Sequence, residues 1–250
     1  MKANGIGRTD INFAELFKWC QEHCDIPIDE DQGFVVLYQI KVDEDEANDE
    51  NMSIIIGDQQ FRIFISSKRL LKLSSNAKII QADSTYKVMW KGFPVIIIGF
   101  SDSNNVFHPI GMAITSEEKT ADYQFVFHGL QYGLARLEIE KLENVTLLAD
   151  NAKAITRGFR YIFGDTKRSM CWFHMRKSII EQLTKIDNKA LEVEVLIDID
   201  NLQCCAFESV FIYAYKALDK KWSQKKLWTI LGNTFLKIGL TSIMGGTKDT

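Results

Sequence analysis

Apolar residues form three short runs in succession between residues 78 and 115, each followed by polar turn residues. The runs are "KIIQADSTYKVMW" (78–90), "PVIIIGFSD" (94–102) and "VFHPIGMAIT" (106–115). They predict three strands, and the short connections between them predict an antiparallel meander. Pro109, inside the third run, cannot donate a ladder hydrogen bond, so we expect that strand to lie at an edge of the sheet.

Helical spacing replaces this pattern after Thr120, which we expect to be the N-cap residue. Apolar residues then recur at intervals of three and four positions, at Phe127, Leu130, Leu134 and Leu137, which predicts a helix. The wholly apolar run at 145–150 follows. Its shortness and composition are typical of a strand that is buried on both faces.

The next stretch predicts a helix at 152–163 that ends at Gly164, then a strand at 168–173 and a helix at 175–186. The resulting order, β-β-β-α-β-α-β-α, is similar to the ribonuclease H-like arrangement, an α/β fold with a mixed sheet. In that arrangement the first strand is central and pairs in parallel with the strand after the first helix. We therefore expect such a domain over residues 61–186.

The flanking segments have patterns of their own. Residues 1–60 predict an N-terminal α/β extension with an acidic loop at 42–50, "VDEDEANDE". Residues 187–250 predict a helical C-terminal segment, in which only "LEVEVLIDID" (191–200) has a pattern that does not favour a helix. The sequence thus divides into an extension, a central domain and a helical segment.

Asp83 and Asp150 are the acidic residues that need an explanation in the central domain. Asp83 interrupts an apolar strand, where an ionised carboxylate costs several kcal/mol unless it is paired. Asp150 stands at the end of the strand that should lie beside it. Two neighbouring carboxylates repel each other, and a divalent cation removes the conflict. We therefore expect Mg²⁺ or Mn²⁺ between them. The alternatives are that Asp83 caps a bulge and that Asp150 is an N-cap.

Composition limits the class of protein without deciding the function. Of the residues, 46% are hydrophobic and 25% are charged, as in soluble globular proteins, and the apolar runs are too short to cross a bilayer. The five cysteines form no regular framework, which indicates a reducing compartment. Residues 1–50 hold 13 acidic and four basic side chains, whereas 153–189 hold nine basic and three acidic ones. A basic segment that begins just after Asp150 suits a polyanionic substrate.

Three motifs in this order resemble the Mutator-like element (MULE) transposases of eukaryotes. "ADSTYK" is similar to the family's first-aspartate motif, "LLADNAKAI" to its second, and "CWFHMRK" to its Cys-x-x-His signature, here Cys171 and His174. The resemblance runs from about residue 61 to 185. It implies a DDE-type catalytic domain that cuts and joins DNA strands, with Asp83 and Asp150 as catalytic aspartates and metal ligands.

The resemblance also implies a third acid, a Glu that follows a helical insertion, and no matching segment occurs here. The acids available after Asp150 include Glu192, Glu194 and Glu208, and none has the family's context. We therefore expect a fragment, a truncated copy or a divergent descendant, with inefficient strand transfer.

Other residues have both a functional and a structural interpretation. Cys171 and His174 supply only two ligands, so we favour a role close to the metal site or in DNA contact over zinc binding. Trp172 and Phe173 could stack on bases, but we expect them in the core. Cys204 and Cys205 should also be core. The predicted phosphate contacts are Lys153, Arg157, Arg160 and Arg176.

The function that this resemblance implies is that of a metal-dependent DNA transposase in the nucleus, active in transposition and DNA recombination. DNA is the expected partner, no membrane is expected, and a homo-oligomer is left open. The alternative is a domesticated, non-catalytic DNA-binding or regulatory protein that keeps the fold.

Overall fold

The computed structural model describes residues 12–41, 60–85, 92–102, 104, 106–165, 167–184 and 188–225. The chain divides into two compact units, Met1–Arg168 and Ser169–Thr250. The predicted acidic loop at 42–50 lies outside the described residues, as do the end of the first predicted strand (86–90), Ile186 and residues 226–250.

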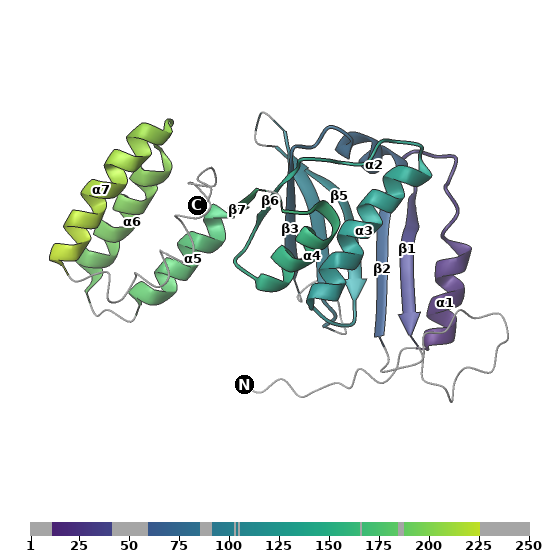
Figure 1. The fold of residues 1–250 in the computed structure, drawn as a ribbon. Helices are drawn as coiled ribbons and strands as arrows, with labels where there is room; N and C mark the ends of the chain where they lie inside the picture. The colour runs from purple at the N-terminus through teal and green to yellow at the C-terminus, as the bar shows by residue number, and fades with distance from the viewer. Residues whose placement is uncertain are drawn as a thin grey trace. The chain divides into compact units, whose positions relative to one another are not determined.

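Among the described residues, seven strands form one mixed sheet, which organises the first unit (Figure 1). Its order is β1-β2-β5-β4-β3-β6-β7. The strands are β1 (Gly33–Lys41), β2 (Gln60–Ser67), β3 (Ile79–Thr85), β4 (Val95–Ser101), β5 (Phe107–Thr115), β6 (Thr146–Ala149) and β7 (Arg168–Met170). Across the sheet, the pairs β1–β2, β2–β5, β5–β4 and β4–β3 are all antiparallel. The next pair, β3–β6, is parallel. The expectation of an α/β fold with a mixed sheet is confirmed.

Helices lie on both faces of this sheet (Figure 1). The helices of the first unit are α1 (Phe13–Glu22), α2 (Lys68–Ser74), α3 (Thr120–Arg136) and α4 (Lys153–Phe163). The main core joins α3 and α4 to the strands through fully buried residues such as Ile80, Ile98 and Leu130. A smaller core places Phe13 of α1 against Phe61 and Ile63 of β2. Because side chains alternate along a strand, these two cores occupy opposite faces.

The α3 and α4 helices pack closely because Gly158 has no side chain. A Cβ atom at that position would lie 2.7 Å from the Gln124 nitrogen and 2.7 Å from the Tyr123 Cβ. The end of α4 follows the sequence prediction: Gly164 is the C-cap and has φ of 75°, a left-handed conformation that glycine adopts without strain. The predicted helix at 120 begins there, with Lys119 rather than Thr120 as its N-cap.

The prediction that the third meander strand lies at an edge is wrong. β5 pairs with β4 on one side and with β2 on the other, through Arg62↔Thr115 to Ile65↔Met112. Pro109 is tolerated because it lies outside the part of β5 that pairs with β2, next to an irregularity where Gly99 opposes Pro109 and Ile98 opposes Gly111. Proline occurs at such bulges because a residue at this position does not need to donate a backbone hydrogen bond to the neighbouring strand.

The second unit contains α5 (Trp172–Leu183), α6 (Lys189–Gln203) and α7 (Glu208–Gln224). The expected exception at 191–200 is wrong, because these residues are part of α6. Val195, Ile199 and Leu202 are buried on one side of that helix, a spacing of four and three that only a helix brings together. The α6 and α7 helices are joined by Asp198, whose Oδ2 accepts hydrogen bonds from Trp222 Nε1 at 3.0 Å and from Lys221 Nζ at 2.7 Å.

Three smaller expectations about this unit also need correction. The strand predicted at 168–173 ends at Met170, because Cys171 is already the N-cap of α5. Phe173 is therefore a helical residue and is 68% exposed rather than buried. Cys204 is exposed at the C-cap of α6 rather than in the core. The predicted boundaries at residues 60/61 and 186/187 stay predictions.

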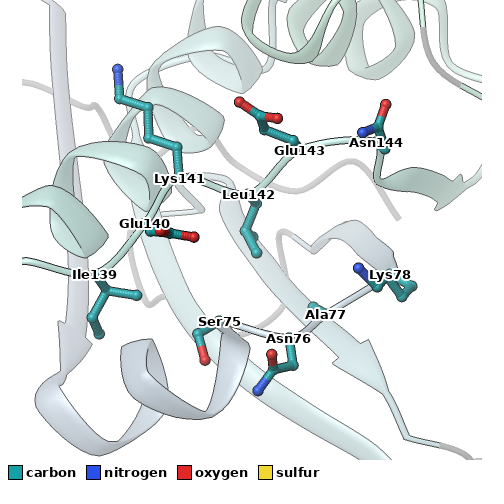
Figure 2. A pocket seen from close by; sticks show the side chains of 10 residues that line it. All are labelled: Ser75, Asn76, Ala77, Lys78, Ile139, Glu140, Lys141, Leu142, Glu143 and Asn144. Carbon is teal, nitrogen blue, oxygen red and sulfur yellow. The ribbon is translucent and has the colours of Figure 1, made fainter.

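An open pocket of about 890 Å³ lies at the amino ends of β3 and β6. Figure 2 shows its two lining segments, which face each other: residues 75–78, which lead into β3, and residues 139–144, which lead toward β6. Gln131 of α3 holds the second segment, since its Nε2 donates to the Leu142 carbonyl at 2.8 Å and its Oε1 accepts from the Leu142 N–H at 3.0 Å. We call this end of the two strands the amino edge.

Candidate functional site

The parallel ladder between β3 and β6 places two aspartates at neighbouring positions. It runs from Ile79↔Thr146 to Ala82↔Ala149, and the next residues on the two strands are Asp83 and Asp150. Adjacent strands are about 4.8 Å apart. Asp83 and Asp150 are 67 positions apart in the sequence, but each comes directly after the last residue pair of this ladder, Ala82↔Ala149. We call this end of the two strands the carboxyl edge.

Asp83 is exposed, and its neighbours show which face of the sheet it occupies. Ile80 and Ala82 are buried under the helices, whereas Ile79 is 42% exposed. Because side chains alternate along a strand, Asp83 shares a face with Ile79, the face that α3 and α4 leave uncovered. Asp83 Oδ1 accepts a hydrogen bond from the Ser84 N–H at 2.9 Å.

Asp150 is half-buried and begins the connection from β6 to α4. Its Oδ1 accepts a hydrogen bond from the Ala152 N–H at 2.9 Å, and Ala152 is the N-cap of α4. Asp150 thus stabilises the turn before the helix without being the N-cap itself. This bond uses one carboxylate oxygen. An ionised carboxylate has further lone pairs on both oxygens, so this bond is compatible with the expected role of Asp150 as a metal ligand.

Arg168 is the basic residue beside Asp150. Its Nη2 donates a hydrogen bond to the Asp150 carbonyl oxygen, and its Nε is buried without a hydrogen-bond partner. Burial lowers the pKa of the Arg168 guanidinium, and the charge of Asp150 acts in the opposite direction. The end of β6 is therefore held by a cation that the sequence analysis did not select.

Tyr123 and Glu118 are the other residues at the carboxyl edge that sequence reasoning missed. Tyr123, in the first turn of α3, is fully buried, and its hydroxyl donates to Glu118 Oε1 at 2.5 Å. Burial raises the pKa of Tyr123 most, and the hydrogen bond to Glu118 and the charges of Glu118 and Asp150 raise it further, whereas Ser84 acts in the opposite direction. Glu118 and Asp150 thus both raise the pKa of the buried Tyr123 hydroxyl.

A basic face on α4 follows directly after Asp150. Lys153, Arg157 and Arg160 are exposed at intervals of four and three residues, so they share one side of the helix. Arg160 Nε forms an ion pair with Asp165 Oδ1 at 2.9 Å, between two exposed side chains. Tyr161, 73% exposed, lies next to this row. The row supports the predicted phosphate contacts without testing them.

The remaining predicted site residues lie in the second unit, on or next to α5. Cys171 is the N-cap of that helix, and the rings of Phe173 and His174 are in edge contact, with centroids 5.5 Å apart. Arg176 forms an ion pair with Asp200, with Nε to Oδ1 at 3.1 Å and Nη2 to Oδ2 at 3.3 Å. The roles of Cys171, His174 and Arg176 stay predictions.

The three weak candidates for the third acid are also in the second unit, and two of them pair with lysines. Glu192 contacts Lys189, and Glu194 contacts Lys221 and Lys225. The hydrogen bond from Lys225 is the largest cause that lowers the pKa of Glu194. Glu208 lies in the first turn of α7. Across the described parts of the chain, no three His, Cys, Asp or Glu side chains lie close enough together to hold a metal ion.

Comparison with known proteins supports the resemblance seen in the motifs. Residues 79–178 match the family model of the MULE transposase domain, a range that contains Asp83, Asp150, Cys171 and His174. No curated protein matches the chain. Among the helices that the structure describes, none has the length and apolar character needed to cross a membrane.

Proposed function

We propose that the first unit is the core of a MULE-type transposase domain with a ribonuclease H-like fold, and that it acts on DNA in the nucleus with Mg²⁺ or Mn²⁺. The observation that carries this proposal is the parallel ladder after which Asp83 and Asp150 follow on adjacent strands. The match of residues 79–178 to the MULE transposase domain supports it.

The donors at the carboxyl edge have the right chemistry for such an ion. Carboxylate oxygens are the ligands that Mg²⁺ prefers, and it commonly uses one or two of them together with substrate phosphates. Asp83 is exposed to an incoming substrate, and Asp150 is oriented by the Ala152 N–H. A bound divalent ion would supply activation of an attacking oxygen and stabilisation of a leaving oxygen.

The chain's own basic residues would hold the DNA at this edge. Lys153 and Arg157, at the start of α4, lie three and seven positions after Asp150 and are exposed. Contacts from such residues to phosphates position the duplex without reading its sequence. Their charge would also offset the repulsion between the DNA backbone and the two aspartates.

A second candidate function is a non-catalytic DNA-binding protein that keeps the fold. It is favoured by the finding that, among the described residues, no three acidic or other metal-binding side chains gather within reach of one ion. Catalysis in two-metal sites depends on a fixed relation between the ions. Binding of DNA phosphates depends only on basic residues, so it does not require that relation.

Incubation of the purified chain with supercoiled DNA and Mn²⁺ distinguishes the two functions. Nicking that disappears in the Asp83→Asn variant would establish metal-dependent cleavage. Glu143→Gln, an exposed change at the amino edge, is the matched control and should nick like the wild type. DNA binding without nicking by the wild type would support the non-catalytic function, and an absence of DNA binding would contradict both.

A further inference from the structure

Arg168 is a half-buried cation in direct contact with the end of β6. β7 lies next to β6 in the sheet, and the Leu147 N–H donates to the Lys167 carbonyl at 3.0 Å. The next residue, Arg168, donates from Nη2 to the Asp150 carbonyl oxygen. This contact uses the backbone of Asp150, so it does not occupy the carboxylate that we propose as a metal ligand.

The other two buried or half-buried arginines of the first unit, as far as the structure describes it, are compensated more fully. Arg62 pairs with the Asp122 carboxylate and also donates from Nη1 to Gln39 Oε1 at 2.9 Å. Arg136 donates from two nitrogen atoms to two backbone carbonyls and lies over the Phe34 ring, 5.3 Å from its centroid. Arg168, by contrast, donates to a neutral carbonyl, and its Nε is buried without a hydrogen-bond partner.

The hydrogen bond to Asp150 does not by itself account for a charged residue at this position. Gln131 holds the backbone of Leu142 at the amino edge with a neutral amide, and a neutral donor could hold the Asp150 carbonyl in the same way. A guanidinium adds five N–H donors and a permanent charge. A partly desolvated charge is costly without an anion, and half-burial leaves part of Arg168 open to solvent. The arrangement therefore favours an anion that comes from outside the chain.

A phosphate group of DNA has the chemistry that this position requires. Guanidinium and phosphate groups form two parallel, charge-assisted hydrogen bonds. A divalent ion held by Asp83 and Asp150 would also bind phosphate oxygens. Since Arg168 contacts Asp150 directly, one phosphate group could bind both the ion and the guanidinium.

We propose that Arg168 binds a phosphate group of the DNA beside the cation held by Asp83 and Asp150. This inference rests on the proposed function and deepens it. The phosphate contacts predicted on α4, Lys153 and Arg157, are exposed side chains of one helix. Arg168 comes from β7 and is bonded to Asp150 itself, so its phosphate is the one next to the ion.

The experiment measures binding of a labelled duplex to the full chain by fluorescence anisotropy, in EDTA and over a range of salt concentrations. Each phosphate contact contributes about 0.9 to the slope of log K against log salt concentration, so Arg168→Gln should lower the slope by about 0.9. Arg168→Lys keeps the charge and should keep the slope. It should bind the duplex more weakly than the wild type, because an ammonium group lacks the planar fork that matches phosphate.

Arg69→Gln is the matched control, because this exposed arginine of the same unit is already paired. Its Nη2 donates to Asp31 Oδ2 at 2.9 Å. The variant loses the same charge as Arg168→Gln and should leave the slope unchanged. If Arg168→Gln lowers the slope no more than Arg69→Gln does, the phosphate contact is overturned.

A second variant and a second ligand keep the test decisive. Melting temperatures show whether each variant is folded. If Arg168→Gln does not fold, Arg168→Lys decides, and wild-type affinity of this variant for the duplex overturns the contact. Inorganic phosphate is tested at constant ionic strength. If it raises the melting temperature of the wild type but not of Arg168→Gln, while the DNA slopes are equal, the residue binds free phosphate and the DNA contact is overturned.

Failure of the proposed function has a different signature. A wild type that does not bind the duplex, or that binds Mn²⁺ no more tightly than Asp83→Asn does, contradicts the proposed function. If the wild type binds both and the slope of Arg168→Gln is unchanged, only the role of Arg168 fails. If Mn²⁺ binding fails but Arg168→Gln lowers the slope, the phosphate contact stands as part of the non-catalytic function.

Discussion

The amino edge and the carboxyl edge of β3 and β6 differ in shape and in chemistry. The amino edge is hollowed by an open pocket of about 890 Å³, whose charged lining residues are of both signs. The carboxyl edge is where Asp83 and Asp150 follow the last pair of the ladder. The proposed site therefore lies away from the pocket. Strand direction supports this placement, because the ligands of open α/β sheets bind beyond the carboxyl ends of the strands.

The α3 helix connects the two edges and is anchored differently at each. Near the carboxyl edge, the buried Asp122 accepts from Arg62 Nε at 2.6 Å and from the Lys119 N–H at 2.7 Å. Near the amino edge, the anchor is the neutral Gln131, which bonds both backbone groups of Leu142. A charged anchor costs more when it is broken, because its partner is left as an unpaired buried charge.

The largest effect is expected from Asp122→Asn. Arg62 and Asp122 are 8% and 0% exposed, and breaking a buried pair typically costs about 3–5 kcal/mol. Urea unfolding followed by circular dichroism would measure the loss. Asp165→Asn breaks the exposed pair with Arg160 and should cost less than about 1 kcal/mol. Equal losses in the two variants would show that the carboxyl edge is not held by its charged anchor.

Mn²⁺ should stabilise the protein through the carboxyl edge only. At a concentration of about 100 times its dissociation constant, a ligand that binds only the folded state adds about 2.7 kcal/mol to the free energy of unfolding. Thermal unfolding with and without Mn²⁺ should show this gain in the wild type and in Glu143→Gln. The double variant Asp83→Asn with Asp150→Asn should show none. An equal gain in the double variant would place the ion elsewhere.

Gln131→Leu tests the neutral anchor at the amino edge. The change removes both partners of the buried Leu142 backbone groups, and an unsatisfied buried group costs about 1–3 kcal/mol. We expect urea unfolding to show a loss within this range, smaller than that of Asp122→Asn, with Mn²⁺ binding unchanged. A change in Mn²⁺ affinity would mean that the two edges are coupled through α3.

The smallest effect concerns the salt dependence of DNA binding. Each phosphate contact contributes about 0.9 to the slope of log K against log salt concentration. Replacing Lys153 and Arg157 by Gln should therefore lower the slope by about 2, as measured by fluorescence anisotropy with a labelled duplex. The matched pair at the amino edge, Lys78→Gln with Lys141→Gln, should leave it unchanged. A lower slope in that pair instead would move the DNA to the other edge.

Local patterns predicted those elements whose packing is decided by neighbouring residues. The helix that ends at Gly164 and the apolar strand β6 were predicted from a few residues each, because a glycine at a helix end and a short apolar run are strong local signals. The expected burial of this strand on both faces is wrong, since Leu147 and Ala149 are buried but Thr146 and Leu148 on the other face are only half-buried. The mixed α/β character followed from the order of such elements.

Contacts between residues far apart in the sequence determine the structural features that local patterns did not predict. The second neighbour of β5 is β2, which belongs to the predicted extension, and nothing near Pro109 indicates that pairing. Residues 191–200 partly alternate like a strand, but the buried side of α6 and the N-cap Asn188, which accepts from the Leu191 N–H, favour the helix. Glu118 was missed because its hydrogen bond comes from the buried Tyr123 hydroxyl. In the sequence, Tyr123 is only one aromatic residue within a helical pattern.

The parallel pairing of β3 with β6 also determines where the chain can gain or lose residues over evolutionary time. A single insertion within the four residues of β6 would turn the side chains that follow it to the opposite faces of the sheet. Ala149 would then leave the core, and Asp150 would lose its place after the pair Ala82↔Ala149. Added residues in a surface connection cost little, since loop closure depends only weakly on length. Homologues should therefore differ in length between α3 and β6 and agree in length along β6 as far as Asp150.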